Sequence, residues 1–455
     1  MKVVVTGGGG QLGTAVLERL VALRTVKKIV SLDLLPPVVP SPRIDWRIAD
    51  MRDPGLERHL EGADALVHLA FIVTKAASVA TMQAVNVEAS ARIFEAAAAH
   101  GVQRIVYSSS VAAYGIVAGQ PVPILETTLR QRSPCLTYAD NKWEVEDDLD
   151  GFEAAHPEIA VVRLRPGILM GRRVSHVSEA WLRQRVMPVV GEGRAPLVWD
   201  EDVADAVILA LTKDVRGAYN LCASDPLKAE EVAALAGFRP LRVPNAVLTG
   251  ASRASGALGP LLGEKRFDVG WLEAQRVDLI PSAEKAKREL GWKPKYPTCG
   301  DVAIVFGKNA RRGTDRRIRV FLSMASRLGG RAKEAAEMPR EARMMTLTIH
   351  LDISGPDGGD YTIHLENGAL SVKSGIPRPP DSTVTMSAET LLELLAGQTE
   401  TSTASMVGKI RVRGEPLAGL VVGGIVSGFR RATALPGTRG KIAKRLSTWF
   451  GGPSS

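Results

Sequence analysis

The sequence predicts an α/β fold, a doubly wound parallel sheet with a small second lobe, followed by a C-terminal α+β domain. Two observations predict the first part: an apolar run at residues 3–5 leads through closely spaced glycines into a helical pattern, and strand-like runs then alternate with helical ones. After Met345, strand patterns separated by turn residues predict a further domain. We place the first domain at residues 1–300, a basic helical linker at 301–343 and the second domain at 344–455.

Composition and length narrow the class of protein. The chain has 455 residues, 45% of them hydrophobic, which calls for two or three domains with buried cores. No apolar run reaches the ~20 residues that a membrane-spanning helix needs, and the N-terminal strand pattern leaves no place for a signal peptide. The three cysteines are widely spaced and suit free thiols rather than a metal site. We therefore expect a cytoplasmic protein without a bound metal.

Positive charge is concentrated between the two expected domains. The formal net charge is +9, and residues 308–343 hold eleven Lys and Arg against four Asp and Glu. Such a segment suits a solvated linker or an anionic membrane surface, and we expect no nucleic-acid partner because no aromatic-rich strand pair or zinc pattern accompanies it. Ile318, Phe321 and Leu322 begin an apolar stripe there. The stripe predicts a helix packed on one of the domains, with peripheral membrane contact as the alternative.

A glycine turn organises the first domain. Gly7, Gly10 and Gly13 follow the strand at residues 3–5 and introduce the helical pattern at 12–21. Only glycine combines positive φ with a close backbone approach to a pyrophosphate. The unpaired N–H groups at the start of the following helix point at the phosphate charge. This order of strand, turn and helix predicts a Rossmann-type dinucleotide site.

A carboxylate ends the next strand. Asp33 closes the apolar run at residues 28–33, where the adenosine ribose of a dinucleotide accepts a carboxylate partner. With no Arg or Lys beside it, this Asp favours the 2'-OH of NAD over the 2'-phosphate of NADP. Asp50 and Met51 follow a third short strand and suit the two sides of an adenine. Asp53 suits an N-cap of the next helix.

Two further strands, at residues 65–70 and 104–108, flank an alanine-rich helix at 82–100. His68 alternates inward among apolar neighbours, so we expect a hydrogen-bonded core histidine and not a catalyst. Ligands of parallel sheets lie at the carboxyl ends of the strands. Residues 108–110, all serines, end their strand at that edge.

Tyr138 and Lys142 start the next helical pattern, and positions i and i+4 share one face of a helix. A fixed cation beside a phenol stabilises the phenolate, which lowers the tyrosine pKa from about 10 towards the range of a general acid/base. The lysine keeps donors for a ribose hydroxyl, and Ser110 can hold the reacting oxygen. The spacing arises by chance in many chains. Here it follows a dinucleotide turn and a strand that ends in serines.

These motifs together resemble the extended short-chain dehydrogenases/reductases of the epimerase/dehydratase branch, over residues 1 to about 300. The stretches that carry the resemblance are residues 6–13, Asp33, Asp50, residues 68–70, Asn86, residues 107–115, Tyr138, Lys142, residues 163–171 and residues 281–294. The resemblance implies that Tyr138 is the acid/base, that Lys142 binds the nicotinamide ribose and that Ser110 orients the substrate, with Ser109 as a weaker candidate. It also implies a small substrate subdomain, and dimers are usual in that family.

The expected site follows from the motifs and the resemblance together. We assign catalysis to Ser110, Tyr138 and Lys142, and NAD contacts to Gly7, Gly10, Gln11, Leu12, Gly13, Asp33, Asp50, Met51, Leu69, Ala70, Asn86, Ser108, Tyr138, Lys142 and Pro166. One departure concerns the substrate. Where sugar-nucleotide members usually carry an asparagine, this chain has Ile168, Leu169 and Met170, and Val198 and Trp199 follow later. This run favours an apolar pocket over a sugar-diphosphate cleft.

The C-terminal part resembles the sterol carrier protein type two family, from about residue 345 to 435. The stretches at residues 383–397 and 406–415 carry this resemblance. It implies a small sheet and helices around an apolar tunnel for lipids. His350 and His364 alternate along strands and are expected to be structural.

Three hypotheses follow for the whole chain. The first is an NAD-dependent oxidoreductase that interconverts a hydroxyl and a keto group on a hydrophobic, sterol-, isoprenoid- or polyketide-like substrate, with a tethered lipid-carrier domain. The second is a sugar-nucleotide epimerase or dehydratase whose tail serves assembly. The third is a lipid-binding protein without turnover.

Overall fold

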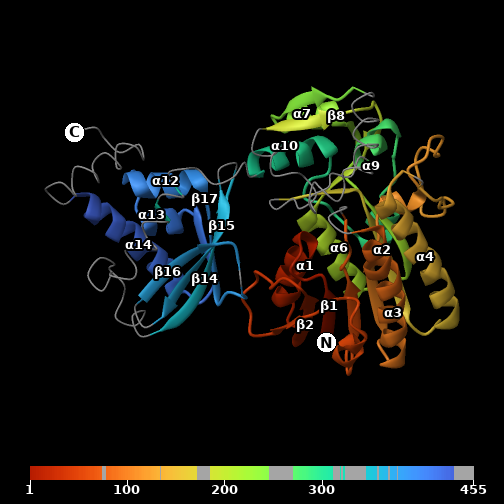
Figure 1. Ribbon diagram of the computed structural model, residues 1–455, viewed down its shortest axis with the longest axis horizontal. Helices are drawn as coiled ribbons and strands as arrows, with labels where there is room; N and C mark the ends of the chain where they lie inside the picture. Colours follow the sequence, from red (N-terminus) through yellow and green to blue (C-terminus); the bar gives the residue numbers. More distant parts are fainter. Residues whose placement is uncertain are drawn as a thin grey trace. The chain divides into compact units, whose positions relative to one another are not determined.

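A computed structural model gives the structure of the chain (Figure 1), and it describes residues 1–73, 78–133, 135–171, 185–244, 270–310, 318, 321–322, 345–355, 358–366, 369–376 and 378–434. The chain falls into two compact units. The first unit holds Met1–Leu35 and most of the chain between Arg43 and Lys308. The second unit holds Pro36–Pro42 and the chain from Asn309 on.

A seven-stranded parallel sheet forms the centre of the first unit. Its strands lie side by side in the order β11 (Gly217–Leu221), β6 (Ala160–Pro166), β5 (Arg104–Ser108), β4 (Ala65–His68), β1 (Lys2–Thr6), β2 (Lys28–Asp33) and β3 (Ile44–Ile48). Every neighbouring pair is parallel. The strand order reverses direction beside β1, which confirms the doubly wound sheet expected from the alternation of strands and helices.

Helices cover the sheet in two groups (Figure 1). One group is α1 (Gln11–Ala22) and α6 (Asp200–Thr212), which pack on each other. The other group contains α2 (Val79–Gln83), the π-helical segment η2 (Ala84–Glu88), α3 (Ala89–Ala99) and α4 (Thr137–Ala155). Two short helices pack on this group, η1 (Pro54–His59) on α3 and η3 (Val111–Tyr114) on α4. Leu66, Ile105, Phe94 and Leu149 belong to one buried cluster between strands and helices.

The helix expected at residues 82–100 is longer and less regular than its pattern. It begins at Val79 because the Ser78 side chain accepts a hydrogen bond from the Thr81 N–H and caps it. One π-helical turn then interrupts it at Ala84–Glu88. The far end agrees with expectation, since Gly101 adopts positive φ (71°) directly after the last turn.

A small lobe completes the first unit. Its described strands form two-stranded sheets: β7 (Ile168–Met170) with β10 (Leu197–Trp199), β8 (Val186–Val189) with β13 (Arg239–Arg242), and β9 (Arg194–Ala195) with β12 (Leu227–Lys228). Its described helices are short: α7 (Ala229–Leu235), α9 (Gly270–Glu273), η4 (Ala274–Arg276), η5 (Ala286–Leu290) and α10 (Cys299–Asn309). Asp202, on α6, ties this part together. Its carboxylate accepts from the Lys295 N–H at 2.7 Å, and its carbonyl accepts from Trp292 Nε1 at 2.8 Å.

The glycine turn is held by backbone contacts that leave no room for side chains. Gly7 has φ of 76°, and a Cβ there would lie 2.7 Å from the Ala70 nitrogen. A Cβ on Gly13 would lie 2.1 Å from the Gly7 carbonyl oxygen. The Gly7 N–H donates to the Leu32 carbonyl at 2.9 Å, so the turn joins the ends of β1, β2 and β4. These contacts explain the spacing of the glycines.

The second unit is a five-stranded mixed sheet with helices. The strand order is β16 (Ala369–Ser374), β15 (Gly359–Glu366), β14 (Thr346–Ser354), β17 (Ser382–Ser387) and β18 (Ile410–Gly414), and the helices are α12 (Ala388–Ala396), α13 (Thr401–Met406) and α14 (Leu417–Ala434). Only the β14–β17 pair is parallel within the described strands. Ser387 caps α12 by accepting from the Thr390 N–H at 3.0 Å, and Gly397 ends it with φ of 74°.

Part of the expected linker is built into the core of the second unit. Ile318, Phe321 and Leu322 are buried in the same cluster as Leu391 and Val421. The Phe321 ring packs edge-on against Phe429 at a centroid distance of 5.1 Å. The described start of the apolar stripe therefore packs on protein, while most of the linker's arginines lie outside the described residues.

Other sequence expectations concern what the chain lacks. Within the described ranges no helix is both long and apolar enough to cross a membrane. The same ranges contain no cluster of three His, Cys, Asp or Glu side chains suited to a metal ion. Cys135, Cys222 and Cys299 are free thiols, as the spacing predicted.

We predict that Gly13→Ala destabilises the first unit by about 1–3 kcal/mol, the usual cost of overpacking against atoms that cannot move aside. Gly151→Ala is the matched control, because a Cβ at that position on α4 meets nothing within 4 Å. In a helix interior this change stabilises by about 0.5–1 kcal/mol. Urea unfolding of the full chain measures both. Equal midpoints for the two variants would contradict the close packing described for the turn.

Candidate active site

The carboxyl ends of β1, β4, β5 and β6 meet at one edge of the sheet, beside the glycine turn. Thr6 connects this edge, since its hydroxyl oxygen accepts from the Leu69 and Ala70 N–H groups, each at 3.2 Å. The same hydroxyl lies 2.7 Å from His68 Nδ1. Leu69 and Ala70, both assigned to the cofactor, thus lie directly against the glycine turn. A cradle without Cβ atoms at a helix N-terminus fits a dinucleotide pyrophosphate.

His68 is structural, as expected. Its side chain is fully buried, and Nε2 lies 2.9 Å from the Ser90 hydroxyl. Burial, with a smaller contribution from the Lys142 charge, lowers the His68 pKa to about 3. The ring is therefore neutral at physiological pH and does not act as an acid.

Asp33 stands at the end of β2 and faces the glycine turn. Its carboxylate accepts from the Gly9 N–H at 2.9 Å and from the Leu35 N–H at 2.8 Å. The side chain thus holds the turn in shape while remaining half-buried at the sheet edge. This position agrees with the ribose contact assigned to it.

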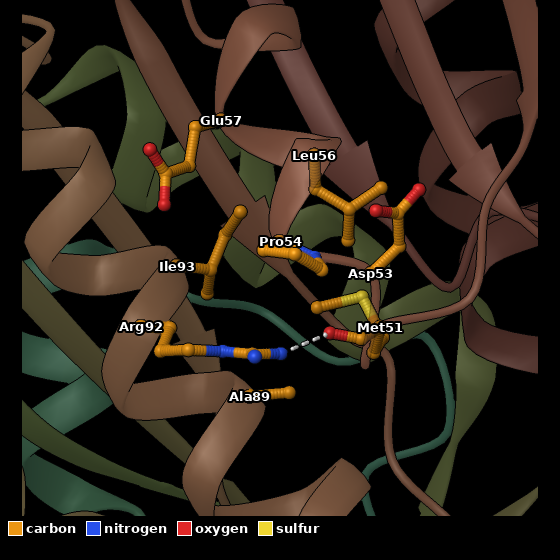
Figure 2. A pocket seen from close by; sticks show the side chains of 8 residues that line it. All are labelled: Met51, Asp53, Pro54, Leu56, Glu57, Ala89, Arg92 and Ile93. Atoms are coloured by element: carbon orange, nitrogen blue, oxygen red, sulfur yellow. Dashed lines mark hydrogen bonds between the residues drawn. The ribbon is translucent and has the colours of Figure 1, made fainter.

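Asp50 and Met51, the residues assigned to the adenine, both contact other residues of the protein. Hydrogen bonds from the Arg52 side chain, at 2.6 Å, and from the Arg52 backbone lower the Asp50 pKa to about 2. Figure 2 shows that Arg92 Nη2 donates to the Met51 carbonyl, at 2.9 Å, beside a pocket between η1 and α3. The Met51 side chain is buried among apolar residues of this layer. Asp53 caps η1 by accepting from the Gly55 N–H, as expected.

Gln11 and Asn86 both have protein partners. Gln11 Nε2 donates to Asp200 Oδ2 at 3.1 Å, which ties the start of α1 to the start of α6. Asn86 accepts from the Ile72 N–H at 2.7 Å and donates to the Ile72 carbonyl at 3.0 Å. Asn86 therefore fixes the chain after β4, and an additional contact with the cofactor stays a prediction.

The other assigned cofactor residues lie at the same edge. Gly10 forms the N-cap of α1, and Leu12 is half-buried in its first turn. Ser108 is the last residue of β5, and Pro166 is the last residue of β6, the neighbouring strand. All of the motifs therefore converge on one edge of the sheet, although the cofactor contacts themselves stay predictions.

Tyr138, Lys142 and Ser110 come together as the spacing predicted. Tyr138 and Lys142 lie one turn apart on α4, and Ser110 caps η3 by accepting from the Ala112 N–H at 3.1 Å. Lys142 Nζ donates to the Ser108 carbonyl at 2.6 Å and to the Tyr107 hydroxyl at 3.2 Å. The lysine is thereby fixed against the end of β5. Its distance to the centre of the Tyr138 ring is 5.9 Å.

The expected lowering of the tyrosine pKa is wrong for this structure. Burial raises the pKa of Tyr138 to about 12, and a hydrogen bond with Ser110 acts in the opposite direction. Burial also lowers the pKa of Lys142 well below its ordinary value, against the opposing effect of the Glu146 charge. The spacing of the two residues gave the correct helix face but not the extent of burial, which outweighs the effect of the cation.

Ser109, the weaker candidate for a substrate contact, has a protein partner of its own. Its hydroxyl donates to Oε1 of Glu146, a fully buried carboxylate on α4. Glu146 also accepts from Arg165 Nε at 2.8 Å and forms ion pairs with Arg163 and Arg130 at 3.6 and 3.3 Å. None of the motifs predicted from the sequence included Glu146. Its position four residues after Lys142 was the available signal.

Two aromatic residues beside Tyr138 were also missed. Phe71 follows β4 and packs edge-on against the Tyr138 ring at 5.5 Å, and Lys142 Nζ lies 3.4 Å from the centre of the Phe71 ring. Trp271 on α9 also packs against the Tyr138 ring, with a centroid distance of 5.2 Å. Trp271 is 133 residues away from Tyr138, so no local pattern could have indicated this contact. Val198 and Trp199 are buried core residues.

Family comparisons divide the chain in the same way as its motifs. Residues 3–222 match the NAD dependent epimerase/dehydratase family. Residues 326–427 match the SCP-2 sterol transfer family. Both resemblances stated from the sequence are therefore confirmed.

Individual relatives match the first unit. UDP-glucose 4-epimerase from Streptococcus mutans is 26% identical over 65% of this chain and 92% of its own length. The N-acetyl-alpha-D-glucosaminyl-diphospho-ditrans,octacis-undecaprenol 4-epimerase of Escherichia coli O157:H7 is 27% identical over 38% of this chain, and the match spans half of that relative. The solved UDP-glucose 4-epimerase of Thermotoga maritima with UDP-glucose is 22% identical, covers 68% of this chain and 97% of that one, and has a TM-score of 0.53. It shares the fold.

We predict that Glu146→Gln destabilises the first unit by about 3–5 kcal/mol, because removing one partner of a buried ion pair leaves the other charge uncompensated. Glu192→Gln is the matched control. Its pair with Lys228, at 3.0 Å, is exposed, and exposed ion pairs contribute little to stability. Chemical denaturation of the full chain compares the variants, and an effect of Glu146→Gln no larger than that of Glu192→Gln contradicts the assigned ion pair.

Proposed function

The chain joins an NAD-dependent enzyme domain of the epimerase/dehydratase family, of the extended short-chain type, to a domain of the SCP-2 sterol transfer family, and from this premise we propose a specific reaction. The protein interconverts a hydroxyl and a keto group on a hydrophobic substrate, with NAD(H) as the cofactor. The observation that carries this proposal is the environment of Tyr138. Its phenol is paired with Ser110, and its ring packs against the rings of Phe71 and Trp271.

Each residue has a defined role in this reaction. The bound nicotinamide supplies or accepts the hydride. In ketone reduction the Tyr138 hydroxyl gives its proton to the carbonyl oxygen, and in alcohol oxidation the phenolate takes it back. Ser110 donates to the same oxygen and fixes its distance from the phenol. Lys142, held by the Ser108 carbonyl, offers its remaining donors to the nicotinamide ribose.

The aromatic side chains favour an apolar substrate. A substrate group that reaches Tyr138 lies beside the rings of Phe71 and Trp271, where burial of apolar surface is favourable and sugar hydroxyls lose hydration. The second domain supports the same substrate class through its family. Tethering a carrier to an enzyme raises the local substrate concentration to about the millimolar range without any new contact.

A second candidate comes from the relatives. Two of them are named as epimerases of sugars carried on a nucleotide or on an undecaprenol diphosphate. A lipid-linked sugar would satisfy both the epimerase resemblance and the carrier domain. In that reaction the same phenol and hydride positions would oxidise and then reduce one sugar carbon.

We predict that the full chain oxidises NADH with progesterone or 2-decanone and does not interconvert UDP-glucose and UDP-galactose. Absorbance at 340 nm follows the first reaction, and chromatography of the nucleotide sugars follows the second. Tyr138→Phe should lower kcat by about 10²- to 10⁴-fold, the usual contribution of a positioned acid/base.

Tyr219→Phe is the matched control, because that hydroxyl contacts Glu289 at 3.2 Å and takes no part in the site. Unchanged kcat in Tyr138→Phe would sink the assigned chemistry. Turnover of UDP-glucose without turnover of either ketone would favour the second candidate.

The pH dependence follows from the Tyr138 pKa of about 12. Below this pKa the phenol keeps its proton, so the kcat for ketone reduction should stay flat between about pH 6 and 9. Alcohol oxidation needs the phenolate, so its rate should rise about tenfold per pH unit over the same range. Initial rates in both directions test this. A plateau of the oxidation rate below pH 8 contradicts the raised pKa in the working enzyme.

A further inference from the structure

Glu146 is a buried titratable group that the proposed reaction does not use. It lies on α4 four residues beyond Lys142 and eight beyond Tyr138, so all three side chains share one face of the helix. Its carboxylate is fully buried and receives the Ser109 hydroxyl from the end of β5. This contact joins the helix that carries the tyrosine and lysine to the chain that follows β5, in addition to the bonds from Lys142 to Ser108 and Tyr107.

The contact of Ser109 with Glu146 bears on Ser110, because the two serines are neighbours in the chain. Ser110 has φ of −161° and ψ of 154°, an extended conformation. Ser109 contacts Glu146, whereas Ser110 is paired with the phenol of Tyr138. The two neighbouring serines therefore reach two different residues of α4.

Glu146 is itself rigidly held. Arg165 donates to both of its carboxylate oxygens, and Arg165 Nη1 also donates to the Tyr114 hydroxyl at 2.7 Å. Tyr114 in turn donates to Asn220 Oδ1 at 2.8 Å. Arg163 reaches the Glu146 carbonyl at 3.2 Å. The network spans η3, α4, β6 and β11, so a movement of Glu146 requires several buried bonds to break.

We propose that the Glu146–Ser109 contact positions the proton-transfer pair, by turning Ser110 towards Tyr138 and fixing the register between β5 and α4. Glu146 and Ser109 are thus positioning residues that act through Ser110. The proposal rests on the roles proposed for Ser110 and Tyr138. It requires that loss of the Ser109 hydroxyl disturbs Ser110 while the glycine turn and NAD binding stay intact.

The test uses Ser109→Ala, Ser110→Ala and the double variant in the full chain. Ser109→Ala removes one hydroxyl and leaves the Glu146–Arg165 pair in place, so the protein is expected to fold. We expect a loss of about tenfold in kcat for progesterone reduction and an unchanged Kd for NADH, measured by fluorescence. In the Ser110→Ala background the same change should have no further effect on kcat, since residues acting through one another are not additive.

Ser109→Thr provides the conservative rescue, because it restores a hydroxyl to Glu146. We expect it to return kcat to within about twofold of the parent chain. Equal losses from Ser109→Ala in both backgrounds, or a loss that appears only as weaker NADH binding, would overturn the proposal and leave Ser109 a merely structural residue.

A crystal structure of Ser109→Ala separates this proposal from the proposed function. We expect the Ser110 hydroxyl to leave hydrogen-bond distance of the Tyr138 hydroxyl. If it stays in place, the positioning role is wrong whatever the enzyme turns over. If it moves and no ketone is reduced by the parent chain, the positioning stands and the proposed reaction fails.

Discussion

The close approach of backbone to backbone at the glycine turn is the constraint on which the first unit depends. Gly7 rests on the Ala70 backbone, and Gly13 on the Gly7 carbonyl, at distances that exclude any Cβ. This packing places the start of α1 directly over the ends of β1 and β4. Because the strands are parallel, their carboxyl ends share one edge, and every residue that follows a strand there faces the same region. Thr6, Asp33 and Ser108 reach it from three different strands.

Buried charge provides the second constraint, since it ties α4 to the sheet. Burying Glu146 with its arginine partners carries a large desolvation penalty, which only excellent geometry offsets. Such a network is weak evidence for stability as such. It is stronger evidence for a unique position of Glu146, because both of its carboxylate oxygens accept hydrogen bonds from Arg165 and Oε1 also accepts one from Ser109. The helix that carries Tyr138 and Lys142 is therefore fixed in register with the strand that ends in serine.

Short sequence patterns predicted the features that depend on a few neighbouring residues. The glycine spacing, the carboxylate of Asp33 and the four-residue step from Tyr138 to Lys142 all follow from backbone rules within a few residues. Contacts across long stretches of chain were not predictable in this way. Trp271 meets Tyr138, and Asp202 holds Lys295, through the folding of the lobe.

The pKa values of Tyr138 and Lys142 depend on burial, which the spacing of the two residues in the sequence does not indicate. Position i+4 placed an ammonium near a phenol, and in water that pair would favour the phenolate. Burial acts on both groups towards their neutral forms, raising the pKa of Tyr138 and lowering that of Lys142. Burial thus disfavours a charge on either group. The Phe71 and Trp271 rings beside Tyr138 are an apolar surrounding, in which a polar group that loses its water without a new hydrogen bond is destabilised.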